Sequence, residues 1–455
     1  METTEKLGTH QKALSINLDA KVFGSFAEIG AGQEVARWFL RVGGASGTVA
    51  KTISAYDKEV SDDLYGAGTR YVSKQRLQAM LDNEWAQLLA QLQASRGTTT
   101  KFFSFVDTIS ARNFAGTNDC HGWIGLRFVQ EPGGLPNDVI LHANLRDSTN
   151  LRQQEAVGIL GVNLLYAAQH ALASPNGFLV VLFEDLNLHR LEIDFLELHG
   201  PAFETWDRTE LHVRLVVGEY AQAVVLLPEN EFAPANEALY KRALVLAPGR
   251  FQQLASLHGE LIRSTLEELP REELKESKGS LGLFCLSAQP FTDKMKPLPL
   301  GEIAPLVKSL HALGYGVMVF RSPELYEMSA FANRYTKSRI HFAIGLSVLV
   351  RVLQDRYGEL SGTLLEGIAR LFSQNVRLVV YPMPEDELKQ WIAGTGLQGW
   401  AWDSTAGMVH AEGLHPAKPM DYLYKYLLSE AWILSSQRAI APQPDDKVEN
   451  TSGAD

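Results

Sequence analysis

A short segment in the second half of the chain combines residue types that suit phosphate chemistry. Residues 249–252 read Gly-Arg-Phe-Gln and follow an apolar run at 243–247, and His258 comes shortly after them. Pro248 and Gly249 end the apolar run, a pattern typical of a strand that turns tightly into a helix. A helix amino terminus at the carboxyl end of a parallel strand favours anionic groups, and a nearby histidine can stabilise charge on a phosphate. This segment therefore predicts a phosphate-binding turn.

The residues Gly249, Arg250, Phe251, Gln252 and His258 resemble the signature of the nucleotidylyltransferase superfamily. In particular, they resemble the nicotinate and nicotinamide mononucleotide adenylyltransferases of NAD biosynthesis, whose signature runs Gly-Arg/Ser/Thr-Phe-Gln/Asp-Pro-x-His-x-Gly-His. The resemblance implies ATP binding with Mg²⁺, with the backbone of 249–252 against the nucleotide and His258 in contact with the triphosphate. His258 is therefore the candidate catalytic residue.

The match to this signature is partial. Gln253, Ala255 and Leu257 stand where the family has Pro, the first His and Gly. A second family landmark, a strand that runs into Gly-x-Asp before a helix, resembles the segment from Phe342 onward, in which Gly345 is kept and Ser347 replaces the Asp. The resemblance implies that Gly345 and Ser347 lie at the nucleotide site.

The chain after residue 236 alternates between strand-like and helix-like runs, which predicts a Rossmann-like, doubly wound parallel sheet. The strand-like runs are 243–247, 281–286, 316–320, 340–344 and 377–381, and the helix-like runs are 257–269, 302–313, 324–335, 348–372 and 421–434. We expect this domain to span 236–437, with a disordered polar tail at 438–455.

The first half has no comparably specific motif, and we expect an α/β or α+β domain of unassigned role at 14–235, after a flexible segment at 1–13. Residues 73–92 carry leucines at helical spacing and predict a core-facing helix. We expect strands at 14–28 and 211–217. The glycines between 24 and 47 fit neither the Walker spacing nor a dinucleotide fingerprint, so we assign them to turns and close packing.

A second candidate anion site lies in this first half. His142, Arg146 and Arg152 fall between a strand-like run and a helix, and the two guanidinium groups could clamp a phosphate or a carboxylate. The alternative, non-functional interpretation is a solvated loop with salt bridges. Cys120 stands beside His121, but neighbours on a strand point to opposite faces, so adjacency alone does not make a catalytic pair.

Composition restricts the class of protein. The chain has 455 residues, 45% hydrophobic and 21% charged, with a formal net charge of −11. This acidic balance argues against a nucleic-acid or anionic-membrane binder, since phosphate neutralisation needs clustered Lys and Arg. No run reaches the roughly 18 apolar residues of a membrane helix. The two cysteines form no disulfide or zinc pattern, no metal site is expected, and we expect a cytoplasmic protein.

Three functions remain open from the residues alone. The C-terminal domain could transfer AMP from ATP to nicotinate mononucleotide and release pyrophosphate. It could instead be a catalytically inactive nucleotide-binding or protein-interaction module, a reading that the altered signature favours. A third hypothesis places an unrelated activity in the first domain around Arg146 and Arg152. The expected partner is a nucleotide or another small molecule, and the sequence leaves the oligomeric state open.

Overall fold

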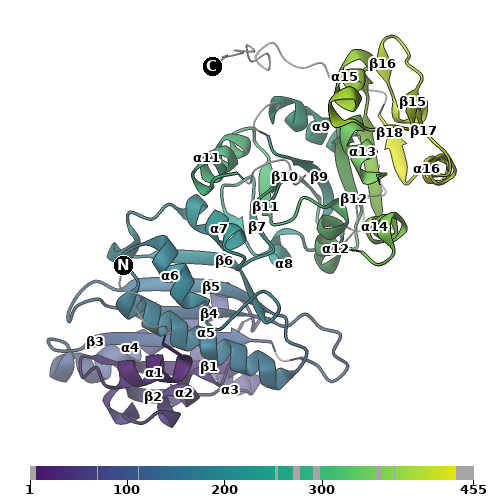
Figure 1. Ribbon diagram of the computed structural model, residues 1–455. Helices are drawn as coiled ribbons and strands as arrows, with labels where there is room; N and C mark the ends of the chain where they lie inside the picture. Colours follow the sequence, from purple (N-terminus) through teal and green to yellow (C-terminus); the bar gives the residue numbers. More distant parts are fainter. Residues whose placement is uncertain are drawn as a thin grey trace, which may run out of the picture. The chain divides into compact units, whose positions relative to one another are not determined.

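The computed structural model describes residues 7–436 except 69, 111, 252–254, 270–276, 291–297, 355–359 and 374. The chain forms two compact units, Met1–Gln222 and Ala223–Asp455 (Figure 1). The boundary lies before the expected position at 235, because strands β7 (Ala223–Leu226) and β8 (Phe232–Ala233) pair within the second sheet. The tail expected at 438–455 lies outside the described residues.

Unit 1 is built on a six-stranded sheet with the order β2-β1-β3-β4-β5-β6. Strands β1, β2 and β3 are parallel, whereas β4, β5 and β6 each pair antiparallel with the strand before them. The strands are β1 (Val22–Gly30), β2 (Val49–Ile53), β3 (Lys101–Ile109), β4 (His121–Phe128), β5 (Asn137–Leu145) and β6 (Leu191–His199). The first half of the chain is therefore an α/β unit with a mixed sheet.

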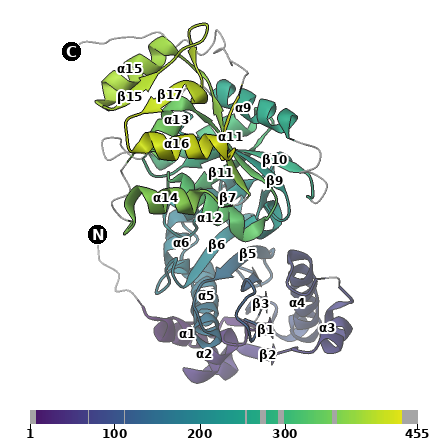
Figure 2. The same cartoon turned by 90° about the vertical axis from the view of Figure 1, so that its right-hand side faces the viewer.

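Helices cover both faces of this sheet (Figure 2). The helices α3 and α4 lie on one face, and α1, α2 and α5 lie on the other. The helices of unit 1 are α1 (Thr9–Asn17), α2 (Val35–Arg41), α3 (Lys58–Tyr65), α4 (Lys74–Arg96), α5 (Asn150–His170), α6 (Pro175–Leu182) and α7 (Arg208–Val217). Apolar side chains fill the space under α2, where the ring of Phe26 lies 5.2 Å from that of Phe39 and 5.3 Å from that of Phe103.

The predictions of two strands in unit 1 were wrong. The segment expected as a strand at 14–28 divides into the end of α1 and the start of β1, and α1 begins inside the segment expected to be flexible. The segment expected as a strand at 211–217 is helix α7, whose amino terminus is capped by the side chain of Asp207. Its alternating Leu211, Val213 and Leu215 mimic a strand, but Val216 is buried as well, so the buried residues cover most of a helix rather than one face of a strand.

Unit 2 contains an eight-stranded sheet with the order β18-β13-β12-β9-β10-β11-β7-β8. All neighbours from β18 to β11 are parallel, and β7 and β8 add an antiparallel edge. Its parallel strands are β9 (Ala243–Gly249), β10 (Ser280–Ser287), β11 (Gly316–Phe320), β12 (Ile340–Gly345), β13 (Val376–Tyr381) and β18 (Ile433–Ser435).

The strand order of unit 2 confirms the expected Rossmann-like fold. Counted along the chain, the parallel strands lie in the order 3-2-1-4-5-6, with β9 first, β12 fourth and β18 sixth. The direction of winding reverses between β9 and β12, the topological switch point. The helices of unit 2 are α8 (Ala235–Ala238), α9 (Ala255–Glu268), α11 (Leu300–His311), α12 (Leu325–Tyr335), α13 (Leu346–Val352), α14 (Thr363–Leu371), α15 (Glu385–Thr395) and α16 (Met420–Ser429).

Two long helices expected in unit 2 are shorter than the sequence indicates. The stretch expected as one helix at 348–372 contains α13 and α14 as separate helices. The terminal helix expected at 421–434 ends at Ser429 as α16, and the chain then forms strand β18. The two-stranded sheets β14 (Met383–Pro384) with β16 (Met408–Val409) and β15 (Trp400–Trp402) with β17 (Leu414–Pro416) complete the unit. Within the described residues, no helix has the length and apolar character of a membrane span.

The pairing of β1 with β3 predicts a strict requirement for glycine at position 24. A Cβ atom at Gly24 would lie 2.1 Å from the backbone oxygen of Phe103, which cannot move without breaking the sheet. We expect Gly24→Ala to lower the free energy of unfolding by about 2–3 kcal/mol. Urea unfolding followed by hydrogen exchange of β1 and β3 measures this loss in unit 1 alone.

Gly47→Ala is the matched control, because its Cβ would approach nothing closer than the Asn17 oxygen at 3.4 Å. We expect that variant to change the free energy of unfolding by less than about 0.5 kcal/mol. Equal stability of the Gly24→Ala and wild-type chains would contradict the close pairing of β1 and β3.

Candidate functional site

The carboxyl ends of β9 and β12 part at the switch point of unit 2. The two strands pair from Ile340 and Leu244 only as far as Phe342 and Leu246. Beyond these residues each strand keeps its outer neighbour, since β9 pairs with β10 up to Gly249 and β12 pairs with β13 up to Gly345. Strands that separate in this way at a switch point form the position where ligands bind in open α/β sheets. Gly249 and Gly345 end the two strands on either side of it.

Phe251 connects the turn after β9 to helix α9. Its backbone has φ +52°, an uncommon conformation for a non-glycine residue, and its ring is buried. The ring lies edge to face against His258, with centroids 4.9 Å apart, and against Phe284 at 5.3 Å. A Cβ at Gly249 would lie 2.8 Å from the Phe251 ring, so a larger residue at this position would displace that ring. The structure thus brings Gly249, Phe251 and His258 together, whereas Gln252 lies outside the described residues.

Gly345 and Ser347 lie at the start of α13. Gly345 is the amino-terminal cap of this helix, and a Cβ added there would meet no atom of the described residues within 4 Å. Ser347 is partly buried. At these two strand ends Gly249, Arg250, Gly345 and Ser347 carry no carboxylate, and no group of three or more His, Cys, Asp or Glu residues suited to a metal occurs in the described part of the chain.

The three residues of the second candidate anion site have separate environments in unit 1. The side chain of His142 is fully buried in β5. Arg146 forms an ion pair with Glu192. Arg152 is exposed in the first turn of α5, where its backbone N–H donates to Thr149. The structure therefore does not gather the three side chains into one clamp.

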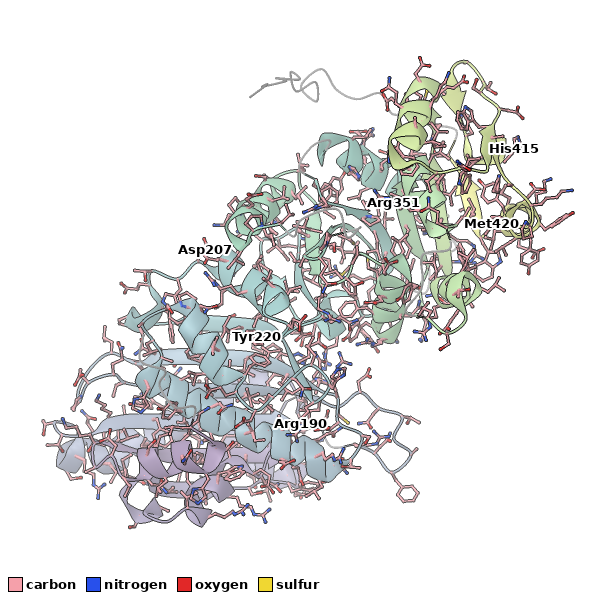
Figure 3. All side chains as sticks on the ribbon, viewed as in Figure 1. Arg190, Asp207, Tyr220, Arg351, His415 and Met420 are labelled. Atoms are coloured by element: carbon pink, nitrogen blue, oxygen red, sulfur yellow. The ribbon has the colours of Figure 1, made fainter. Side chains whose placement is uncertain are left out.

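A neighbouring cation, Arg190, holds the loop where these residues lie (Figure 3). Its Nε atom is 2.9 Å from Asp147 and its Nη2 atom is 2.8 Å from Glu155. The Nη2 atom also donates to the backbone oxygen of Arg152 at 3.2 Å. Ion pairs of this kind order a loop, which agrees with the alternative interpretation of this region as a solvated loop with salt bridges.

His142 belongs to a chain of three polar side chains on neighbouring strands. Its Nδ1 atom is 2.6 Å from the carboxylate of Asp194 on β6, and its Nε2 atom is 2.9 Å from Nδ1 of His121 on β4. Asp194 and His142 are buried, whereas His121 is only partly buried. Burial, assisted by the neighbouring His142, lowers the pKa of His121 to about 4. His121 is therefore a neutral imidazole at pH 7.

Two buried carboxylates face one another across β1 and β3. Glu28 and Asp107 are paired in register, and both are buried. Glu28 accepts hydrogen bonds from the backbone N–H groups of Val35 at 2.7 Å and Ala36 at 3.2 Å, at the start of α2. Among the described residues, neither oxygen of Asp107 has a hydrogen bond of good geometry, and a Cβ at Gly32 would lie 1.9 Å from one of them. The turn at Gly32 thus covers Asp107.

Burial dominates the titration of this carboxylate pair. It raises the pKa of Glu28 from 4.5 to about 7, against the opposing effect of the backbone N–H groups of Val35 and Ala36. It also raises the pKa of Asp107 well above its usual range, and the charge of Glu28 adds to the rise. The pair therefore holds at least one proton under mildly acidic conditions.

Cys120 lies in an environment that disfavours its thiolate form. Its side chain is buried, and burial raises the pKa of the thiol above its usual value. A raised pKa keeps a cysteine in the unreactive thiol form at pH 7. His121 bonds to His142 on the next strand rather than to its sequence neighbour.

Sequence reasoning missed Glu28, Asp107 and Asp194, and it placed His121 only beside Cys120. Glu28 and Asp107 sit inside apolar strand runs, and a charged residue in such a run is the one available signal of a paired or functional carboxylate. Their pairing partner depends on strand register, which the sequence alone does not specify.

Comparisons with known proteins show only a weak similarity to a few solved structures. No family model matches the sequence, and no curated protein matches it. Among solved structures, the chain is similar to the competence/damage inducible protein CihA from Agrobacterium tumefaciens, with 21% identity over 35% of this chain and 94% of that chain and a TM-score of 0.27. It is also similar to a competence or damage-inducible protein from Enterobacter asburiae, with 13% identity over 36% and 99% of the two chains and a TM-score of 0.26.

A third neighbour is a competence-damaged protein (CinA) superfamily protein from Enterobacter cloacae, with 13% identity, 37% and 94% coverage and a TM-score of 0.24. None of these three names refers to nucleotidyl transfer. At such identities and TM-scores the likeness carries no inference about the activity of this chain.

The raised pKa of Glu28 predicts a definite pH dependence of stability. Between pH 4.5 and about 7 the folded state binds more protons than the unfolded state, so the contribution of Glu28 is complete at low pH and is lost as the pH rises through this window. The Glu28→Gln variant has no such proton. As the pH rises from 4.5 to 7.5, we expect the unfolding free energy of Glu28→Gln to increase relative to that of the wild type by about 2–3 kcal/mol. Urea unfolding with hydrogen exchange of β1 measures it.

Glu131→Gln is the control for this experiment, since the Glu131 side chain is 79% exposed. We expect its difference from the wild type to stay constant with pH. Parallel pH profiles of the wild-type and Glu28→Gln chains would show that Glu28 is ionised throughout and would contradict its burial as a protonated acid.

Proposed function

We propose that unit 2 binds a nucleotide, ATP in the first instance, at the switch point between β9 and β12. The observation that carries this proposal is the parting of these two strands beyond Phe342 and Leu246. The phosphates lie against the strand ends, where Gly249 and Gly345 present backbone without side chains. Open α/β sheets bind their ligands at this position.

The residues around the two strand ends support binding of an anion. Arg250, partly buried directly after β9, supplies a positive charge in a chain whose formal net charge is −11. Gly345 leaves space beside its backbone, because a Cβ there would lie more than 4 Å from every other residue that the structure describes. A phosphate could therefore approach the backbone at Gly345 without displacing a side chain.

A second candidate function for this unit is adenylyl transfer, which the position of His258 favours. His258 lies in the first turn of α9, and its contact with Phe251 holds it beside the turn at Gly249. In this reaction an oxygen of the nicotinate mononucleotide phosphate attacks the α-phosphorus of ATP. The new P–O bond forms as the bond to the β-phosphate oxygen breaks, and pyrophosphate leaves with that electron pair. His258 would stabilise the charge that develops on the phosphates.

Binding without transfer is the better supported of the two. Ser347 and Ala255 stand where the related signature has an acid and a histidine, and the loss of one charge-stabilising donor lowers a rate by about 10²–10³. Of the described residues at the strand ends, Gly249, Arg250, Gly345 and Ser347 carry no carboxylate, so none of these four is assigned as a Mg²⁺ ligand. Unit 2 is thus proposed as a nucleotide-binding module first and as a transferase second.

Titration calorimetry with ATP, using a variant that fills the space at Gly345, tests nucleotide binding. Gly345→Leu is expected to fold, because the backbone φ is −88° and a Cβ there meets no atom of the described residues within 4 Å. We expect this variant to weaken ATP binding at least about tenfold, because the leucine occupies the phosphate position. Gly394→Leu is the matched control, because Gly394 on α15 is exposed and equally open. Equal ATP affinity of both variants, or no binding by the wild type, would refute the proposed site.

A pyrophosphate-release assay with ATP and nicotinate mononucleotide separates the two functions. If unit 2 only binds, the wild-type chain releases no pyrophosphate while it still binds ATP. If it is a transferase, release occurs and His258→Ala lowers its rate by about 10² or more. Release that His258→Ala leaves unchanged would assign the activity to another residue.

A further inference from the structure

Strand β2 forms one edge of the sheet in unit 1 (Figure 2). It pairs with β1 alone, so one side of the strand carries backbone N–H and C=O groups that no neighbouring strand uses. No residue that the structure describes hydrogen-bonds to this outer side. Unpaired strand edges are templates for pairing with another strand. Residues Val49–Ile53 therefore offer a place where the sheet can be extended.

The opposite edge strand, β6, is covered by the chain itself. The backbone N–H of Ile193 donates to the backbone oxygen of Tyr220 at 3.0 Å, and that of Leu196 donates to Nε2 of His212 on α7 at 3.4 Å. Soluble proteins protect edge strands by such covering segments, or by proline and charged side chains on the strand. Unit 1 thus protects one edge of its sheet and leaves the other open.

The sequence of β2 contains little that would block pairing. It reads Val-Ala-Lys-Thr-Ile, without proline, and Lys51 carries its only charge. The Lys51 ammonium lies 2.9 Å from a carboxylate oxygen of Glu84 and 2.7 Å from the amide oxygen of Gln87, both on α4, so it is directed over the face of the sheet. An irregularity in the pairing with β1 falls between Val49 and Lys51, and the register is regular from Lys51 to Ile53. No free charge therefore guards this edge.

Exposed apolar side chains flank the edge on both faces of the sheet. Tyr56 precedes α3 and Val60 lies in the first turn of that helix, whereas Leu40 lies on α2, which covers the other face. The exposed fraction is 74% for Tyr56 and 55% for Leu40. Apolar side chains gathered beside an open strand are typical of a surface that a partner covers.

The end of α1 fixes the segment that leads from α2 into β2. The Asn17 amide donates to the backbone oxygen of Gly43 at 2.7 Å, and the Thr48 hydroxyl donates to that of Ile16 at 3.4 Å. Residues 43 and 48 thus lie against the same end of α1. Arg41, the last residue of α2, therefore lies near the start of β2.

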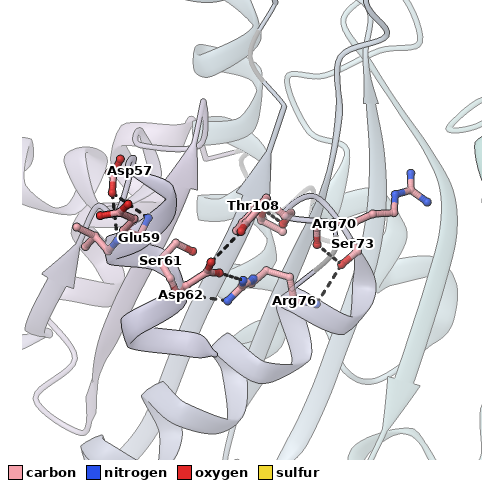
Figure 4. A network of polar contacts seen from close by, with 10 residues as sticks. Asp57, Glu59, Ser61, Asp62, Arg70, Ser73, Arg76 and Thr108 are labelled. Carbon is pink, nitrogen blue, oxygen red and sulfur yellow. Dashed lines mark hydrogen bonds and ion pairs between the residues drawn. The ribbon is translucent and has the colours of Figure 1, made fainter. Parts of the chain in front are cut away.

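The two ends of β2 carry opposite charges. Arg41 lies near its start, and Asp57 and Glu59 follow its end; all three are exposed, and none forms an ion pair with a residue that the structure describes. Figure 4 shows Asp57 bonded to the backbone of Glu59 at the start of α3, while Asp62 further along the helix holds Arg76. The two carboxylates beside β2 thus remain available to a partner.

We propose that β2 pairs antiparallel with β2 of a second copy of this chain around a two-fold axis, so that one sheet runs through unit 1 of both copies. A two-fold interface uses the same surface twice, and an open strand supplies both the donors and the acceptors for such self-pairing. Antiparallel pairing sets the Arg41 end of each copy beside the Asp57 and Glu59 end of the other. This self-complementary charge pattern favours a second copy over an extended peptide of another protein.

Sedimentation equilibrium of the full-length chain measures this association, and we expect a dimer at about 10 µM. Thr52 is exposed on β2, and Thr52→Lys places a lysine of each copy close to the axis. We expect this variant to raise the dissociation constant of the dimer at least about tenfold, because like charges then meet across the paired strands. Thr98→Lys is the matched control, because Thr98 is an equally exposed threonine between α4 and β3, and it should leave the constant unchanged.

A wild-type chain that stays monomeric up to about 100 µM, or equal association of the wild-type and Thr52→Lys chains, would overturn the proposal. Unchanged midpoints of urea unfolding in both variants establish that the loss of association is not a loss of folding.

Thr52→Glu provides the complementary variant. Alone it should be as monomeric as Thr52→Lys, whereas an equimolar mixture of the two variants should regain the dimer, because opposite charges then face each other across the axis. Such recovery requires that position 52 of one copy lies beside position 52 of the other. A mixture that stays monomeric would contradict the pairing of β2 with itself.

Hydrogen exchange of residues 49–53 tests the strand pairing directly. Amides on the outer side of β2 should exchange more slowly as the concentration of the wild-type chain rises, and their exchange should not depend on concentration in Thr52→Lys. A wild-type dimer whose β2 amides exchange at the rate of the monomer would place the interface elsewhere and refute the proposal.

Discussion

Parallel pairing of the central strands is the constraint on which both units depend. Parallel neighbours such as β1 with β3, or β9 with β10 and β12, cannot be joined by tight turns, so each connection must cross over the sheet. Their carboxyl ends therefore gather at one edge. In unit 1 this edge also receives the start of β4, because that strand runs antiparallel to β3. In both units the residues of the candidate sites lie at this end of the sheet.

The two edges carry different chemistry. In unit 2 the strand ends at the switch point are glycines, and the adjoining Phe251 is used for packing against His258 and Phe284. Such an edge offers backbone and space, which suit binding. In unit 1 the edge carries titratable side chains, and burial moves the pKa of Glu28 up and that of His121 down. Groups shifted in opposite directions are typical of sites where protons are transferred.

The sequence predicted the parts of the fold that depend on local pattern. Apolar runs and Pro-Gly breaks reflect local structure. They therefore predicted the alternating strands and helices of unit 2 and the turn at Gly249. Helix α7 was missed because Leu211, Val213 and Leu215 alternate as in a strand, while the helix is fixed by its Asp207 cap and by packing. Strand β18 was missed because a strand of three residues has little pattern of its own.

The candidate sites were predictable only in part. The signature residues around Gly249 could be proposed from the sequence, since they are close together in it; their role stays a prediction. The carboxylate pair of Glu28 and Asp107 and the chain from Asp194 to His121 were not, because strand register brings together residues that are far apart in the sequence. Register follows from the complete packing of the sheet rather than from any one segment.

Hydrogen exchange of the full-length chain with and without saturating ATP tests the central claim most directly. If the nucleotide binds at the switch point of unit 2, amide exchange should slow at the carboxyl ends of β9 and β12 and at the start of α13, with unit 1 unchanged. Slowed exchange confined to unit 1, or no change at a saturating ATP concentration, would contradict this account of the protein.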